Sequence, residues 1–313
     1  MREVHVAVAV VRRGGKVLIA RRPDFVHQGG LLEFPGGKVE ASETVQQALV
    51  RELKEETGLL IPEVSLTPLI GIRHDYGDKR VFLDVWATDA AVGEPEGLEG
   101  QALGWREADS LRDEDFPAAN RAIIRAVKLP GHYAITGAFG GVPDGLRRLD
   151  QSLAAHSPAL VVLRAPWLGK AEYRAMAQEG RAICARHQSR LVLHGENASA
   201  ELAEAFAGWH LTWAQAVRMK SRPIAKNRWL AVSCHDEPQM AHALRLDADF
   251  VTLGPVQATA SHPGAPALGW AGFRALAWHA TLPVYALGGL GFNDLDYARE
   301  CGAQGIAGIG NWW

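Results

Sequence analysis

The pattern of hydrophobic and polar residues divides the chain into two parts. In the first part, alternating stretches at 4–11 and 16–20 lie on either side of a Gly-Gly pair and predict a β-hairpin. The stretch 43–57 carries its apolar residues at helical spacing, and Gly58 follows it where a left-handed glycine commonly ends a helix. We expect two more strands and a second helix in this part, at 66–74, 80–88 and 117–128.

The second part begins after Leu129-Pro130-Gly131, a sequence typical of a hinge. Short apolar runs then alternate with segments of helical length. The runs predicted as strands are 133–136, 160–163, 191–194, 210–212, 230–233, 250–253, 284–287 and 305–309. Buried strands separated by helices in this number predict a (β/α)₈ barrel, with its sites at the carboxyl ends of the strands. No helix-length segment follows the last run, so we expect another element to cover that flank.

The length of 313 residues agrees with two domains of the α/β class, which we place at 1–129 and 132–313. The formal net charge of −2 provides no broad basic field, so we expect a small charged substrate and no stable nucleic-acid binding. Three cysteines without a CxxC pair favour neither a disulfide framework nor a zinc ribbon, and a reducing cytoplasm is the simplest location. We identify no export signal, and no apolar run reaches the roughly 18 residues that a membrane helix requires.

The helix predicted at 43–57 has an acidic face. Glu52, Glu55 and Glu56 stand at i, i+3 and i+4, so three carboxylates share one side of the helix. A hard cation would relieve their repulsion, and carboxylate and diphosphate oxygens are ligands that Mg²⁺ prefers. Glu43 lies eight positions before Arg51 and is a candidate to brace that arginine.

The sequence around this face follows one pattern. An isolated ExxEE is most often only a solvated helix surface, but here a Gly-Gly turn at 36–37 precedes the helix and would let backbone approach a phosphate or a metal closely. Residues 37–59 resemble the Nudix box, GX5EX7REUXEEXGU with U aliphatic, and every fixed position matches. The resemblance covers residues 1 to 128 and is strongest to the MutT-type 8-oxo-dGTP diphosphatases, through the LEFPGGK segment at 32–38 and Glu99-Gly100-Gln101. It implies a Nudix α/β/α sandwich.

The resemblance also implies which residues form the active site. The carbonyl of Gly36 and the side chains of Glu52, Glu55 and Glu56 would bind Mg²⁺, with Mn²⁺ as a substitute, and Glu99 would add a further metal-binding and catalytic carboxylate. Metal-assisted attack of water on the β-phosphorus would release a nucleoside monophosphate and pyrophosphate, with Glu52, Glu56 or Glu99 as alternative bases. The substrate contacts that carry over are Arg22, His27, Glu33, Phe34, Pro35, Gly36 and Asn120.

Asn120 is the candidate for nucleobase specificity. Its amide offers both a donor and an acceptor, and can therefore read the purine edge that changes when guanine acquires an 8-oxo group. The alternative is that Asn120 merely caps the helix that follows it. The leading expectation is hydrolysis of 8-oxo-dGTP, which would cleanse the nucleotide pool and serve DNA replication and DNA repair.

The second part resembles the thiamine phosphate synthase and TenI group of barrels over residues 132–310. The segments that carry this resemblance are 253–262, 268–270 and 284–290. Glycines end the last two predicted strands, where barrels commonly hold a phosphate on backbone N–H groups, although glycine is also ordinary in turns. The candidate phosphate site comprises Thr259, Gly288, Gly289, Gly308 and Gly310.

The second part also departs from that group. His262 stands where a synthase would carry the lysine of its Thr-x-Thr-Lys loop, and the acidic pair that holds a magnesium diphosphate is absent around 195–198. We therefore expect a degenerate barrel that binds a small phosphorylated or thiazole-like ligand, or that only packs against the first domain. His235 would line such a site or be structural, and Cys234 is expected as a buried thiol. Two alternatives remain: hydrolysis of a thiamine-related diphosphate, and a barrel that senses a ligand.

Overall fold

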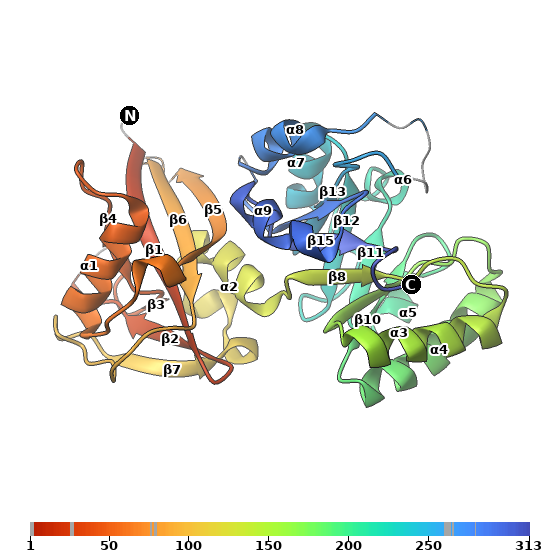
Figure 1. Cartoon of the computed structure of the whole chain (residues 1–313), viewed down its shortest axis with the longest axis horizontal. Coiled ribbons are helices and arrows are strands. Elements are labelled where there is room, and N and C mark those ends of the chain that lie inside the picture. The colour runs from red at the N-terminus through yellow and green to blue at the C-terminus, as the bar shows by residue number, and fades with distance from the viewer. Residues whose placement is uncertain are drawn as a thin grey trace. The chain divides into compact units, whose positions relative to one another are not determined.

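The computed structural model describes residues 3–25, 28–75, 77, 80–259, 264, 266–278 and 280–313. They form two compact units, of which the first consists mainly of residues 1–129 and the second of residues 130–278 and 282–313 (Figure 1). The first unit is built on a mixed β-sheet, and the second is a closed parallel barrel.

The first unit contains seven strands among its described residues: β1 (Glu3–Arg13), β2 (Lys16–Arg21), β3 (Leu32–Glu33), β4 (Gly36–Lys38), β5 (Thr67–Asp75), β6 (Arg80–Thr88) and β7 (Leu103–Glu107). The sheet order is β3-β2-β1-β6-β5, with β4 paired to β1 and β7 paired to β2. β1 and β6 run parallel, and the hairpin predicted from β1 and β2 is confirmed. The helices are α1 (Val45–Thr57) and α2 (Arg121–Lys128), with short 3₁₀ helices η1 (Glu63–Ser65), η2 (Ala108–Ser110), η3 (Asp113–Asp115) and η4 (Ala118–Asn120).

Alternation along β1 decides which helix covers each face of the sheet. Successive side chains of a strand point to opposite faces. Ala7 and Ala9 therefore pack in one core cluster with Leu53 of α1, whereas Val8 and Val10 belong to the cluster that contains the apolar residues of α2. The sheet thus has a helix on each face, as Figure 1 shows, and the predicted α/β/α sandwich is confirmed.

Local chemistry sets the ends of α1. Thr44 accepts a hydrogen bond from the backbone N–H of Gln47, and the Gln47 side chain accepts one from the backbone of Thr44, which completes a capping box. The helix therefore begins at Val45, two residues later than Glu43, where the prediction began. Gly58 ends the helix in the left-handed region, with φ 70°, and its N–H donates to the carbonyl of Lys54.

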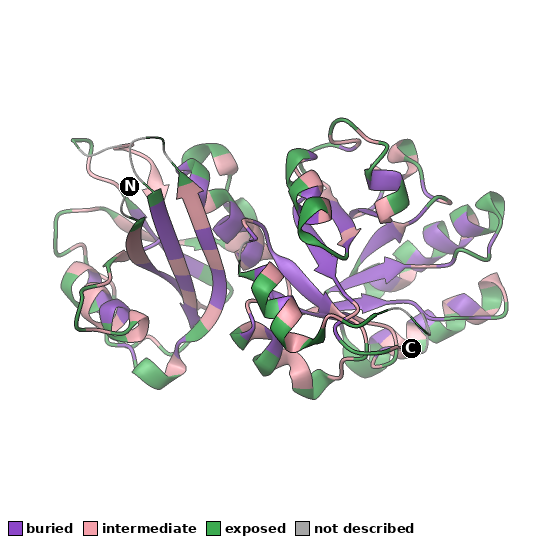
Figure 2. Ribbon diagram, turned by 90° about the horizontal axis from the view of Figure 1, so that it is seen from above, coloured by how far each residue is buried: buried purple, intermediate pink, exposed green. Residues whose placement is uncertain are grey.

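The second unit confirms the predicted barrel. Its strands are β8 (His132–Ile135), β9 (Leu160–Leu163), β10 (Arg190–His194), β11 (Gly208–Leu211), β12 (Trp229–Cys234), β13 (Phe250–Leu253), β14 (Val284–Leu287) and β15 (Gly305–Gly308). They close in the order β10-β11-β12-β13-β14-β15-β8-β9, and their residues are mostly buried, as Figure 2 shows. The helices are α3 (Val142–His156), α4 (Lys170–Arg186), α5 (Ala200–Ala203), α6 (Trp213–Ala216), α7 (Glu237–Arg245), α8 (Gly269–Ala277), η5 (Phe292–Asp294) and α9 (Leu295–Glu300).

A turn that follows β15 covers the flank left without a helix. Trp312 is 3% exposed, and its ring contacts Phe292 and His132 at centroid distances of 5.0 and 5.8 Å. Its carbonyl accepts a hydrogen bond from the hydroxyl of Ser152. Trp312 and the turn that carries it therefore pack at the flank where we expected another element.

The cysteines and the apolar segments of the chain agree with the sequence predictions. Cys184, Cys234 and Cys301 are each buried and free, and burial raises the pKa of the Cys234 thiol to about 12, so the expected buried thiol is confirmed. Across the described part of the chain, no helix is both long enough and apolar enough to span a bilayer.

Candidate functional site

Two glycines bring β4 into contact with the acidic helix. A Cβ on Gly36, which has φ 147°, would lie 2.2 Å from the carbonyl oxygen of Ala7 on the neighbouring strand. A Cβ on Gly37 would lie 2.1 Å from Cδ and Oε1 of Glu52. Glycine at 37 therefore leaves the space that the Glu52 carboxylate occupies, a steric role that the motif alone did not reveal.

Arg51 holds the carboxylates of the helix in place. Its guanidinium donates to Glu43 at 2.6 and 3.2 Å, to Glu52 at 2.8 Å and to Glu55 at 3.2 Å. These hydrogen bonds lower the pKa of Glu43 and raise that of Arg51. The predicted brace between Glu43 and Arg51 is confirmed, and the arginine also offsets part of the repulsion on the acidic face.

Glu56 is the electrostatically perturbed group of this face. Its carboxylate accepts a hydrogen bond from the backbone N–H of Gly36 at 3.2 Å. Burial raises the pKa of Glu56 to about 7, the Gly36 N–H lowers it, and the negative charges of Glu52, Glu99 and Glu33 raise it further. A carboxyl group with a pKa near neutrality can exchange a proton at physiological pH.

The loop that carries Glu99 is attached to the end of α1. The N–H of Leu98 donates to the carbonyl of Glu56 at 3.0 Å, and that of Glu96 donates to the carbonyl of Thr57 at 2.9 Å. Glu99 is exposed, and its charge acts on Glu56 although 43 positions separate the two in the sequence. Gln101 links the same loop to the helix through its side chain, which spacing along the sequence could not show.

These residues fit a divalent cation by their chemistry. Glu52, Glu55, Glu56 and Glu99 offer only carboxylate oxygens, and the pKa of Glu56 is raised mainly by burial and further by the charges of Glu52, Glu99 and Glu33. Among the described residues, however, no three such groups converge on one point, and Arg51 holds the carboxylates of Glu52 and Glu55. The carboxylates of Glu52, Glu55, Glu56 and Glu99 and the carbonyl of Gly36 are the oxygen ligands that would be available to such a cation.

The expected substrate contacts divide into two sets. Arg22 forms an ion pair with Glu33, and burial raises the pKa of Glu33 while Arg22 lowers it. Phe34 is 4% exposed and stacks on Phe116 in the core, at a centroid distance of 5.6 Å. Pro35 is buried as well, and its carbonyl accepts the N–H of Ala9. Phe34 and Pro35 therefore support the sheet, and the polar groups of Arg22 and Glu33 are the ones near the surface.

Asn120 stands at the N-cap position of α2, but its side chain does not cap the helix. The residue has helical backbone angles, φ −80° and ψ −11°, and its side chain makes no capping hydrogen bond. The alternative of a structural cap is therefore not supported, and the partly buried amide is left for another partner. His27 lies outside the described residues.

An arginine and a histidine, Arg164 and His194, lie where two neighbouring barrel strands end at their carboxyl side. Parallel partners project to the same side, and Val162 and Val192 are partners on β9 and β10. Arg164 and His194, each two residues further, therefore lie on the same side, and the ring of His194 contacts the buried ring of His210 inside the barrel at a centroid distance of 5.2 Å. They lie at the strand ends where barrels carry their sites. Burial lowers the pKa of Arg164, and burial together with the charge of Arg164 lowers the pKa of His194 to about 4.

A buried polar cluster lies inside the barrel. The hydroxyl of Tyr133 and Nδ1 of His210 are 3.2 Å apart, and Nε2 of His210 lies 3.0 Å from Oγ of Ser233. His210 is 1% exposed, and burial holds its pKa well below the usual range, so the ring is neutral. The sequence showed these residues only as members of apolar runs.

Hydrogen bonds connect the loops after β14 and β15, which carry the glycines predicted to bind a phosphate. Gly288 and Gly289 have φ 108° and 71°, and the carbonyl of Gly288 accepts the N–H of Gln257 at 3.0 Å. Gly308 ends β15, Gly310 follows it, and the side chain of Asn311 donates to the carbonyl of Leu290 at 3.1 Å, which ties the two loops together. Thr259 is among the described residues and His262 is not.

The residues at 195–198, where a synthase would carry its acidic pair, have other partners. Glu196 lies 3.7 Å from Arg218 in an exposed ion pair. The side chain of Asn197 donates to the carbonyls of Ala165 and Leu168 and so anchors the loop after β9. His235, which is exposed, approaches the carbonyl of Gly254 with Nδ1 at 2.5 Å.

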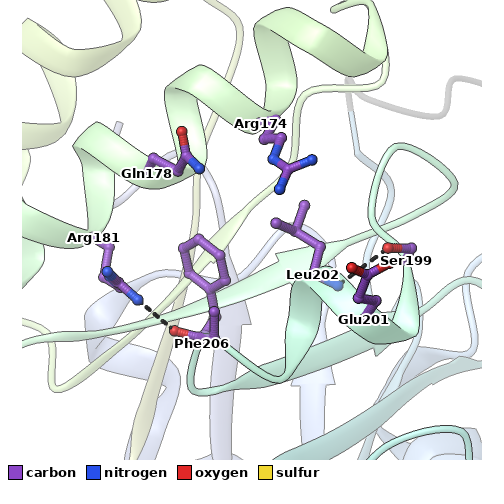
Figure 3. A pocket seen from close by; sticks show the side chains of 8 residues that line it. Arg174, Gln178, Arg181, Ser199, Glu201, Leu202 and Phe206 are labelled. Atoms are coloured by element: carbon purple, nitrogen blue, oxygen red, sulfur yellow. Dashed lines mark hydrogen bonds between the residues drawn. The ribbon is translucent and has the colours of Figure 1, made fainter.

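A pocket of about 190 Å³ lies on the outer side of the barrel, away from these groups. It lies between α4 and the segment 199–206, and Figure 3 shows Arg174, Gln178 and Arg181 projecting from one face of α4. Arg181 donates to the carbonyl of Ala205 at 2.8 Å. The hydroxyl of Ser199, which lines the pocket, accepts the N–H of Leu202 at the start of α5, and no metal-binding cluster is found among the described residues.

The described residues thus form one unit with an acidic helix face on a mixed sheet and a second unit that is a closed parallel barrel. The NUDIX domain family model matches residues 6–126, and the thiamine monophosphate synthase family model matches residues 132–311. The chain therefore belongs to the Nudix hydrolases in its first part and to the thiamine monophosphate synthase and TenI family in its second.

Individual relatives cover one part each. The 8-oxo-dGTP diphosphatase of Escherichia coli K12 is 37% identical over 129 residues, which are 41% of this chain and 98% of that protein. The CTP pyrophosphohydrolase of the same organism is 38% identical over 127 residues, 40% of this chain and 92% of that protein. A protein of Aquifex aeolicus strain VF5, provisionally named thiamine-phosphate synthase 2, is 30% identical over 183 residues, 58% of this chain and 97% of that protein.

Proposed function

We propose that the first domain hydrolyses 8-oxo-dGTP to 8-oxo-dGMP and pyrophosphate. The observation that carries this proposal is the half-buried Glu56, with a pKa of about 7, held by the N–H of Gly36 among further carboxylates. The similarity to a protein named 8-oxo-dGTP diphosphatase supports the choice of substrate. The reaction would remove an oxidised nucleotide from a cytoplasmic pool and so serve DNA repair.

Each group of the chain has a separate task in this mechanism. Glu52, Glu55, Glu56, Glu99 and the carbonyl of Gly36 would hold Mg²⁺ or Mn²⁺, which neutralises the triphosphate when bound. Glu52, Glu56 or Glu99 accepts the proton of the attacking water, since each is a carboxylate at this face of the helix or on the loop attached to it. Arg51 keeps its carboxylate partners oriented.

Nucleobase specificity is assigned to Asn120, and Arg22, His27 and Glu33 are proposed as further substrate contacts. The Asn120 amide makes no capping hydrogen bond, so its donor and acceptor are available to a purine edge. The partly buried Glu33, whose pKa is raised by burial and lowered by Arg22, is a second group that can present a proton or a lone pair. Phe34, Pro35 and Gly36 supply backbone and packing beneath the substrate.

For the second domain we propose binding of a small anionic ligand, phosphorylated or thiazole-like, without synthase activity. Arg164 and His194 lie at the carboxyl ends of neighbouring barrel strands, and the exposed ion pair of Glu196 with Arg218 is no substitute for an acidic pair. Backbone N–H groups of the loops after β14 and β15 would bind the phosphate, with the glycines named above and Thr259. We take the domains as residues 1–129 and 132–313.

A second substrate class is a thiamine-related diphosphate, which is favoured by the presence of a thiamine-type barrel in the same chain. The deciding experiment measures kcat/KM of the full-length protein with Mg²⁺ for 8-oxo-dGTP, dGTP, CTP and thiamine diphosphate, with product analysis. Preference for 8-oxo-dGTP with release of pyrophosphate supports the first proposal. Equal use of 8-oxo-dGTP and dGTP, or preference for CTP or thiamine diphosphate, overturns it.

The barrel proposal has its own measurement. Calorimetric titration with inorganic phosphate is made on Glu56→Gln and on Glu56→Gln/Arg164→Gln, so that the hydrolase site is disabled in both. Binding that weakens at least tenfold on loss of Arg164 supports an anion site at the barrel. No binding, or binding unaffected by Arg164, contradicts it.

A further inference from the structure

The side chain of Gln101 bridges the end of α1 and the backbone of Glu99. Its Nε2 donates to the carbonyl of Glu56 at 3.0 Å, and its Oε1 accepts the N–H of Glu99 at 3.0 Å. A backbone carbonyl can only accept and a backbone N–H can only donate, so the two partners fix the orientation of the amide. One side chain therefore joins the two acidic residues through their main chains.

Backbone contacts close the turn that carries Glu99. The N–H of Gly100 donates to the carbonyl of Gly97 at 3.1 Å, and Gly100 has φ 82°. A Cβ on Gly97 would lie 1.8 Å from the carbonyl oxygen of Gln101. Gln101 is itself only partly exposed, and it lies directly before Ala102, whose carbonyl accepts the N–H of Arg21 at the edge of the sheet.

We propose that Gln101 is a positioning residue that holds Glu99 beside Glu56 for hydrolysis. Glu99 is exposed and belongs to a loop, so its own side chain does not fix its place. The N–H of Leu98 already attaches the loop to the carbonyl of Glu56, and the Gln101 amide adds the tie that reaches the Glu99 backbone itself, at the last turn of α1 where Glu56 lies. The inference rests on the proposed function, in which Glu99 is a catalytic or metal-binding carboxylate.

A double-mutant cycle tests whether Gln101 acts through Glu99. Gln101→Met keeps the length of the side chain and removes both hydrogen bonds; it is compared with Glu99→Gln and with the double variant, using full-length protein, Mg²⁺ and 8-oxo-dGTP. We expect Gln101→Met to lower kcat by about 10- to 100-fold with little change in KM, because small misplacement of a catalytic group has effects of this size. In the Glu99→Gln background, we expect Gln101→Met to change kcat by less than about twofold.

Gln47→Met is the matched control. Gln47 also accepts a backbone N–H with its side chain, from Thr44 at 3.0 Å, but it lies on the first turn of α1 and is exposed. Its kcat should stay at the wild-type value, and the Tm of each single variant shows how much stability each substitution removes. A role in stability alone would lower Tm without the selective loss of kcat.

Three results would overturn the inference. The first is wild-type kcat in Gln101→Met, and the second is a multiplicative loss in the double variant, which would mean that Gln101 acts independently of Glu99. The third is wild-type kcat in Glu99→Gln while Glu56→Gln is inactive, which leaves the hydrolase function standing and removes the role of Glu99. Wild-type activity in both Glu99→Gln and Glu56→Gln would instead contradict the proposed function itself.

Discussion

Replacing Glu56 by Gln tests the electrostatics of the acidic face in the absence of substrate. The pKa of Glu56 is raised from 4.5 to about 7 by burial and by the neighbouring carboxylates. The folded protein therefore binds this proton more tightly than the unfolded chain, and the wild type loses stability as the pH rises from 4.5 to about 7. Gln keeps an acceptor for the N–H of Gly36 but carries no charge, so the variant lacks this loss.

The size of the effect follows from the pKa. A rise from 4.5 to about 7 corresponds to about 3 kcal/mol, and screening of the partly exposed carboxylate reduces this to about 1–2 kcal/mol. At pH 8, Glu56→Gln should thus unfold about 3–6 °C above the wild type, whereas most of this difference should disappear at pH 5.

The assay is calorimetric unfolding of full-length protein at both pH values, with a chelator that removes divalent cations. Glu55→Gln is the control, because it removes the same charge from the same helix face at a side chain that is 57% exposed. Its stability should stay within about 0.5 kcal/mol of the wild type at both pH values. Lower stability of Glu56→Gln at pH 8, or a difference from wild type that does not depend on pH, would refute the reasoning.

Three further predictions concern packing and charge. Gly37→Ala should lower kcat at least about tenfold, because the added Cβ would lie 2.1 Å from the Glu52 carboxylate. Gly104→Ala is the control and should leave kcat unchanged, because no atom lies within 4 Å of its added Cβ. The same kcat in Gly37→Ala and in the wild type would contradict this role of the contact. Arg222→Met should lower the free energy of unfolding by about 3–5 kcal/mol, since Arg222 pairs with Asp249 at 2.8 Å and the two side chains are only 9% and 8% exposed. Lys226→Met, which removes an exposed ion pair, should lower it by less than about 0.5 kcal/mol. His194→Gln should make the protein less sensitive to acid, because a histidine pKa lowered to about 4 makes the folded wild type lose stability as the pH falls from 6.5. Between pH 7 and 5, the free energy of unfolding of the variant should fall by about 1 kcal/mol less than that of the wild type, as measured by denaturant unfolding. Identical losses in the two proteins would argue against a buried neutral ring.

Much of the fold follows from local patterns in the sequence. The strands β6, β9, β13 and β14 have the predicted boundaries, because each is a short run of residues suited to a buried strand between turn residues. β11 was predicted two residues late, since Gly208 does not look like a strand residue. A Cβ on Gly208 would lie 1.9 Å from the carbonyl of Trp229, so the neighbouring strand requires glycine there.

The sequence by itself determined the acidic face and its brace, because Arg51 and the glutamates at 52, 55 and 56 follow the periodicity of one helix and Glu43 lies just before its N-cap. Only the tertiary structure decided that the loop of Glu99 is tied to Glu56 by Gln101. It also decided that Phe34 packs in the core, and that His210 bonds across the barrel to residues on other strands. These contacts join residues far apart in the chain, and their geometry depends on how loops close and strands register, which no local spacing records.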